Sequence, residues 1–106
     1  MSKEFIAKGL VYGKTWGGGY GSYESQELKA KRLNSIMAQA KKGLKEGWLD
    51  GGMGFESLKG ALLDIEVIET ILVKGKEYKR SEYTTELIGD LTEKEQDFLQ
   101  DCLYNR

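Results

Sequence analysis

Histidine and proline are both absent from this chain of 106 residues. The lack of histidine removes the side chain that most often serves as a general base and as a transition-metal ligand. The lack of proline leaves the turns to glycine, asparagine, aspartate and serine. The single cysteine, Cys102, has no second cysteine with which to form a disulfide. We therefore expect no metal site, and nothing in the sequence indicates a cofactor.

Long apolar runs and an excess of one charge are also missing. No apolar segment approaches the ~20 residues that span a bilayer, and none follows a charged N-terminus as in a signal peptide. The 16 basic and 17 acidic side chains nearly cancel, whereas a protein that binds duplex nucleic acid needs a basic surplus. We expect one domain over residues 1–106, in the cytoplasm, with neither membranes nor duplex nucleic acid as partners.

The hydrophobic pattern predicts the first half of the fold. Residues 3–12 alternate with a period of two, which is typical of a strand, and residues 19–24 are the expected return strand of a hairpin. Apolar residues then recur at helical spacing over residues 26–46. Ser25 is the expected N-cap of this helix and Gly47 its C-terminal cap.

The second half of the pattern completes an α+β domain. Residues 48–60 form a glycine-rich connection with a possible helical turn at 55–59. Residues 62–73 and 77–88 are expected to pair as a hairpin through Lys74 and Gly75. Thr92 and Glu95 match a capping box at the start of a short C-terminal helix. The predicted order is ββαββα, with a four-stranded antiparallel sheet and two helices on one face.

A glycine-rich stretch over residues 13–23, GKTWGGGYGSY, joins the first two predicted strands. Gly13-Lys14-Thr15 lacks the glycine five positions earlier that a phosphate-binding P-loop requires, since that residue is Lys8. The GxxG pattern of KH domains and the aromatic strand motif of RRM domains also match in part, but in the wrong structural context. A hairpin with a glycine bulge and with Trp16 or Tyr20 packed inside is the structural alternative.

The same stretch supports a hypothesis for ligand binding that needs no named motif. Aromatic rings can stack on a base, successive glycine amides can surround an anion, and cationic side chains can contact phosphate. The candidate site contains three aromatic, four glycine and two basic residues: Trp16, Tyr20, Tyr23, Gly17, Gly18, Gly19, Gly21, Lys14 and Arg80. A homo-oligomer is expected, because so small a domain forms a deep pocket most readily between copies.

Other polar groups indicate a functional site less strongly. Alternation along the 62–73 strand places Asp64 and Glu66 on one face and Glu69 on the other, so the three do not form one acidic site. Lysines of the long predicted helix (Lys31, Lys41, Lys42 and Lys45) form either a solvated face or a contact for an acidic partner.

Several segments carry a resemblance to known proteins: WGGGYGSY (16–23), GWLDGGMGFESLKGALL (47–63), IETI (68–71), GKEY (75–78) and LIGDLTEKE (87–95). Together they resemble small accessory modules of bacteriophages and mobile elements, some of which are joined to large polyvalent phage proteins. The likeness spans residues 9–98. It implies a setting in which small proteins counter host defence, by sequestering nucleotide immune signals or by blocking an effector such as a CRISPR nuclease. It implies no particular functional residue.

The sequence thus leads to a first hypothesis and two alternatives. The first is a non-enzymatic phage-type accessory protein that binds and sequesters a small nucleotide-like ligand. The second is an anti-CRISPR-like inhibitor that binds a host defence protein. The third, an enzyme, would depend on Asp64, Glu66 or the tyrosines.

Overall fold

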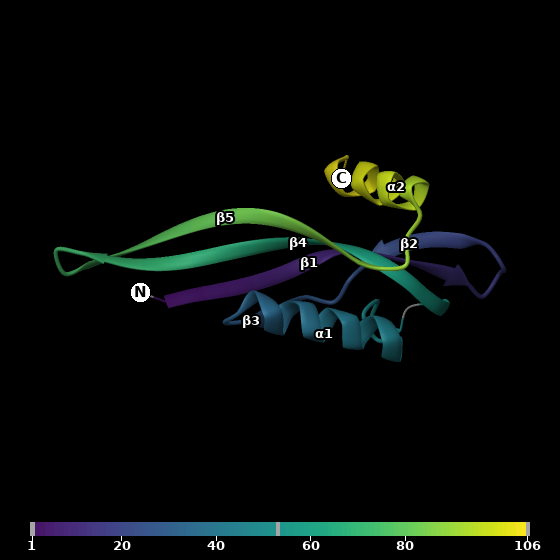
Figure 1. The fold of residues 1–106 in the computed structure, drawn as a ribbon, viewed down its shortest axis with the longest axis horizontal. Coiled ribbons are helices and arrows are strands. Elements are labelled where there is room, and N and C mark those ends of the chain that lie inside the picture. The colour runs from purple at the N-terminus through teal and green to yellow at the C-terminus, as the bar shows by residue number, and fades with distance from the viewer. Residues whose placement is uncertain (1, 53, 106) are drawn as a thin grey trace.

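Five strands and two helices make up the computed structural model of the chain, which describes residues 2–52 and 54–105 (Figure 1). The elements in chain order are β1 (Ser2–Thr15), β2 (Tyr20–Glu24), β3 (Leu28–Ala30), α1 (Leu33–Glu46), β4 (Phe55–Val73), β5 (Lys76–Gly89) and α2 (Glu93–Tyr104). The α+β class and the antiparallel sheet are confirmed. The predicted count of four strands and the order ββαββα are wrong, because β3 is an additional strand.

The sheet has β1 and β4 at its centre, in the order β2-β1-β4-β5. β2 pairs with residues 10–14 of β1, and β3 pairs with residues 5–7 of the same strand. β2 and β3 therefore follow one another along a single edge of β1. On the opposite side of the sheet, β5 pairs with β4 along its whole length.

The two helices lie on opposite faces of the sheet, as Figure 1 shows with α1 below it and α2 above it. Ala7 and Val11 of β1 belong to the larger core with Ile36 of α1. Leu10, on the other face of β1, packs with Leu99 of α2 in a second cluster. The prediction of both helices on one face is wrong, because the middle of the sheet is apolar on both faces and each face needs its own cover.

The first helix begins at Leu33, seven residues after the predicted start. Ser25 is not its N-cap, because its hydroxyl instead accepts a buried hydrogen bond of 2.8 Å from the Gly9 N–H. Leu28 is buried in the core as part of β3. Strand pairing with β1 thus overrides the helical spacing of residues 26–30, since the edge of β1 would otherwise keep unpaired backbone groups.

Several local predictions are confirmed. Gly47 ends α1 with a φ of 82°, and Thr92 with Glu95 forms the capping box of α2. Lys74 and Gly75 both adopt positive φ in the β4–β5 turn, as a type I′ hairpin requires. By contrast, the prediction of a helical turn at residues 55–59 is wrong, because these residues form the beginning of β4.

In the described part of the chain, neither helix combines the length and apolar character needed to cross a bilayer.

Candidate binding surface at the aromatic end of the sheet

The turn between β1 and β2 is fixed by Thr15. Its N–H donates to the Gly19 carbonyl at 2.7 Å, and its hydroxyl donates to the same oxygen at 3.1 Å. The Gly18 N–H, in turn, donates to the Thr15 carbonyl at 3.0 Å, and Gly18 has a φ of 91°. The turn is therefore closed on itself, and one of the amides expected to bind an anion is already occupied.

Trp16 lies on this turn and is 73% exposed. Tyr20, the first residue of β2, is 59% exposed. The structural alternative that placed Trp16 or Tyr20 inside the fold is therefore wrong. The glycine bulge predicted in this hairpin is also wrong, because β1 and β2 pair in regular register from Leu10 with Glu24 to Lys14 with Tyr20. The register shifts instead between β1 and β4, between Tyr12 and Gly13 and again after Lys14.

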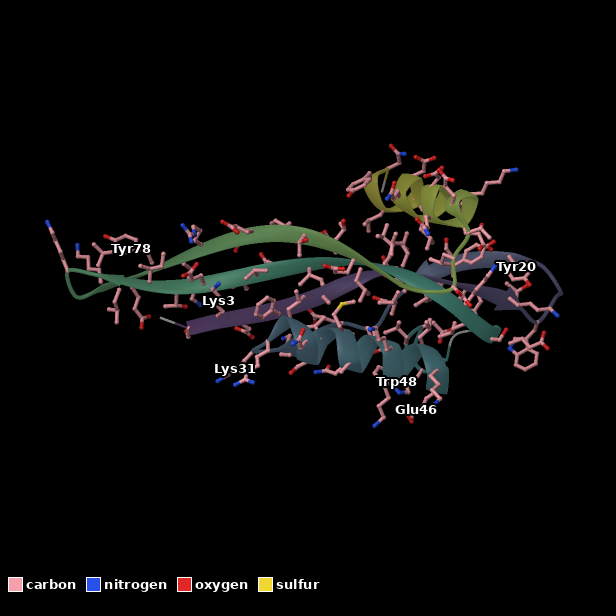
Figure 2. All side chains as sticks on the ribbon, viewed as in Figure 1. Lys3, Tyr20, Lys31, Glu46, Trp48 and Tyr78 are labelled. Carbon is pink, nitrogen blue, oxygen red and sulfur yellow. The ribbon has the colours of Figure 1, made fainter. Side chains whose placement is uncertain are left out.

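Tyr20 is held on the α2 face of the sheet by neighbouring side chains. Its ring stacks on Tyr12 with centroids 5.8 Å apart and an angle of 14° between the planes. Tyr12 in turn meets Phe98 of α2 edge-on at 6.0 Å. The ammonium group of Lys59 lies 5.8 Å from the centre of the Tyr20 ring. Figure 2 shows Tyr20 at this end of the molecule, far from Tyr78 on the β4–β5 hairpin.

Lys59 also forms the shortest ion pair among the described residues, at 2.7 and 2.9 Å from the two carboxylate oxygens of Glu95. The bond from Lys59, together with those at Thr92, lowers the pKa of Glu95 from 4.5 to about 2. The same bond raises the pKa of Lys59. Burial and the nearby Glu95 carboxylate raise the pKa of Tyr12.

The sequence did not predict this network, which consists of Tyr12, Tyr20, Lys59, Glu95 and Phe98. Lys59 faces α2 because the register shift beside it removes it from the regular alternation of β4. The capping box identified Glu95, but nothing near it in the sequence indicates its partner on β4.

Tyr23 lies apart from Tyr20. It pairs with Val11 and Tyr20 pairs with Lys14, so the two tyrosines are on opposite faces of the sheet. Tyr23 lines a hollow of about 340 Å³ beside the segment between β2 and β3. Asp50 also lines it and is 3% exposed, with its Oδ1 accepting from the Gly52 N–H.

The two predicted cations are both paired with carboxylates. Lys14 lies 3.9 Å from Glu56, and Arg80 donates to Glu69 at 2.8 Å. Glu69 is opposite Lys3 in the sheet, which places Arg80 roughly 35 Å from Lys14 along the strands. The fold does not bring Arg80 to the aromatic end. Lys14, Trp16, Tyr20 and the glycines at 17, 18, 19 and 21 remain together there.

The acidic residues of β4 behave as expected from alternation. The Tyr83 hydroxyl donates to Glu66 at 2.8 Å, which raises the pKa of that tyrosine. Asp64 lies on the same face and lines a hollow of about 470 Å³ with Tyr83 and Tyr104. In the described residues no three carboxylate or cysteine side chains are placed to hold a metal ion. Cys102 packs half-buried against the second hydrophobic cluster.

Comparisons with protein-family models, with curated protein sequences and with solved structures found no match to this chain.

Proposed function

We propose that the chain is a non-enzymatic binding protein that docks on a partner protein through its aromatic end. The observation that carries the proposal is the position of Trp16, a large ring exposed at 73% on a turn that Thr15 closes with its own hydrogen bonds. Tyr20 and the glycines of the turn form the rest of this surface.

The exposed aromatics favour a protein partner. Tryptophan and tyrosine are the residues most enriched at the centres of protein interfaces, where they fill pockets of the partner. The turn is closed by Thr15 and the Tyr20 ring is supported by Tyr12 and Lys59. Such support reduces the conformational entropy lost on binding.

The charges at this end disfavour the nucleotide-like ligand of the first hypothesis. A phosphate group would need free cations, whereas Lys14 and Lys59 each lie beside a carboxylate. Arg80 is both paired and distant. Small ligands also prefer concave sites, and Trp16 projects from a turn. These observations support the inhibitor alternative, with the implied phage setting suggesting a host defence protein in the cytoplasm as the partner.

The proposal is tested with the immobilised full chain and a lysate of a bacterial host. We expect the wild-type protein to retain a stoichiometric partner, and the Trp16→Ala variant to lose it. Because Trp16 is exposed, its loss should leave the melting temperature nearly unchanged. Tyr104→Ala is the matched control, since Tyr104 is exposed to a similar extent, at 69%, on α2; it should retain the partner.

Two outcomes would contradict the proposal. One is equal retention of the partner by Trp16→Ala and the wild type. The other is a nucleotide that copurifies with the wild-type chain, gives heat in calorimetry and is lost in Trp16→Ala. The second result would restore the sequestration hypothesis for the same surface.

A further inference from the structure

β5 forms one edge of the sheet over 14 residues, and its outer side pairs with no other described strand. Residues 76–85 are exposed on both faces of the strand. In Figure 1 no helix or strand lies along the outer side of β5 from the β4–β5 turn to the region of α2. An exposed edge of this length is a template for pairing with another strand.

The β4–β5 turn determines which backbone groups of β5 point outward. In a two-residue type I′ hairpin the flanking residues, here Val73 and Lys76, form a hydrogen-bonded pair. The even-numbered residues of β5 therefore direct their N–H and C=O groups toward β4. The odd-numbered residues, from Glu77 to Thr85, direct theirs outward.

We propose that two copies of this chain pair through their β5 edges, antiparallel and centred on Ser81. A twofold axis through Ser81 places the outward groups of residues 77, 79, 81, 83 and 85 opposite those of the second copy. Each of these five positions then exchanges two hydrogen bonds with its partner, about ten in all. The two sheets become one continuous sheet. This interface is independent of the aromatic end.

The charges of β5 select this register. With Ser81 at the centre, Arg80 lies opposite Glu82 of the second copy, and Lys76 lies opposite Glu86. The symmetry doubles both pairs, so four opposite-charge pairs form and no like charges face each other. These four residues occupy positions without hydrogen bonds between the copies, where facing side chains are closest.

The neighbouring symmetric registers are unfavourable. If the twofold axis passes through residue 80, Arg80 lies opposite Arg80 of the second copy. If it passes through residue 82, Glu82 lies opposite Glu82 of the second copy. Like charges directly opposite destabilise a strand pair, so the sequence of β5 disfavours both registers.

The side chains of the proposed interface are available for it. Among the described residues, Lys76, Glu82 and Glu86 form no ion pair within the chain. Arg80 is held by Glu69 of β4 at 2.8 Å. It would lie between this carboxylate and Glu82 of the second copy. Tyr78, 53% exposed, would face Thr84, a favourable pair of aromatic and β-branched side chains.

The decisive test uses two single variants and their mixture. Lys76→Glu places a second carboxylate opposite Glu86, and Glu86→Lys places two lysines opposite each other, so each variant alone contains two like-charge pairs. We expect sedimentation equilibrium to show a dissociation constant about tenfold higher for either variant than for the wild type. An equimolar mixture should recover the wild-type association, because every facing pair in the mixed dimer has opposite charges.

A second measurement fixes the register. The Ser81→Cys variant should form a disulfide-linked dimer under mild oxidation, since facing Cα atoms in such a pair lie about 5.5 Å apart, within disulfide range. Thr84→Cys is the matched control, because residue 84 faces residue 78 and should not crosslink. Wild-type protein that stays monomeric up to about 1 mM, or variants that associate equally well alone and mixed, would overturn the proposal.

Discussion

Gly9 lies at a point of close approach between the two central strands, β1 and β4. A Cβ atom at this position would overlap the Leu62 carbonyl of β4. The Gly9 N–H also donates to Ser25, and its carbonyl accepts from the Ser25 N–H at 2.9 Å. The fold therefore needs a residue without a side chain at position 9, and it also needs the hydrogen bonds of the Gly9 backbone.

We expect Gly9→Ala to lower the free energy of unfolding by about 1–3 kcal/mol, because the strands must separate to admit a methyl group. Gly17→Ala is the control, since its Cβ would meet only the Thr15 hydroxyl at 3.9 Å. Urea denaturation of both variants measures the difference. Equal stability of the two would contradict the close approach of β1 and β4.

Glu95 makes stability depend on pH. Its pKa is about 2 in the folded chain and 4.5 without the fold. A depressed carboxyl pKa stabilises the fold above the unfolded value, and this stabilisation is lost as the pH falls from about 4.5 toward 2. We expect the Glu95→Gln variant to melt a few degrees lower than the wild type at pH 7. Between pH 4.5 and pH 2, its melting temperature should change less with pH than that of the wild type. Glu93→Gln, also in the first turn of α2, should follow the wild-type profile.

At the scale of elements, the segment between β2 and α1 shows most clearly how strand pairing competes with helical spacing. Residues 26–30 have helical spacing, yet β3 adds to the edge of β1 and the Gln26 N–H donates to the Leu49 carbonyl at 2.7 Å. Ser25 is 5% exposed, and its hydroxyl accepts a hydrogen bond from the Gly9 N–H that holds this segment against β1. The hydroxyl of Ser25 therefore supports the sheet and not the helix.

We expect Ser25→Ala to cost about 1–3 kcal/mol of unfolding free energy, because it leaves the buried Gly9 N–H without an acceptor. The helix content measured by circular dichroism should stay unchanged, since α1 begins eight residues later. Ser35→Ala, on the exposed side of α1, should be nearly neutral. A loss of helix content in Ser25→Ala would instead favour the capping role that the sequence predicted.

At the scale of the whole molecule, the chain is elongated, with extents of 58 × 27 × 20 Å. Neither helix reaches the β4–β5 turn (Figure 1), and the two hydrophobic clusters contain no residue between Ile65 and Ile88. β1 begins opposite Thr70, so the β4–β5 hairpin continues beyond it as two strands. Tyr78 near its tip and Trp16 at the other end are both exposed. The two proposed interfaces, β5 and the aromatic end, are therefore separate surfaces.

Hydrogen exchange tests this arrangement along β5. In dilute solution, the amides of Glu77, Lys79 and Ser81 should exchange quickly because they point outward. Those of Tyr78 and Arg80 should be protected by pairing with β4. At high concentration the first set should gain protection if the edges pair. Equal protection of both sets in dilute solution would contradict the hairpin register.

The sequence by itself determined the features that depend on neighbouring residues. Alternation identified the strands of β1, β4 and β5, and it correctly placed Asp64 and Glu66 on one face. Positive φ at Gly75 and the capping box of Thr92 follow from local chemistry. These predictions hold because each depends on residues a few positions apart.

Only the tertiary structure decided which faces the helices cover, where α1 begins, and which polar groups meet. β3 forms because β1 offers an unpaired edge, and Lys59 reaches Glu95 because the register of two distant strands shifts beside it. Arg80 was assigned to the aromatic site from its charge, but strand pairing holds it beside Glu69. Pairing and register between distant segments set these contacts, and spacing along the chain does not reveal them.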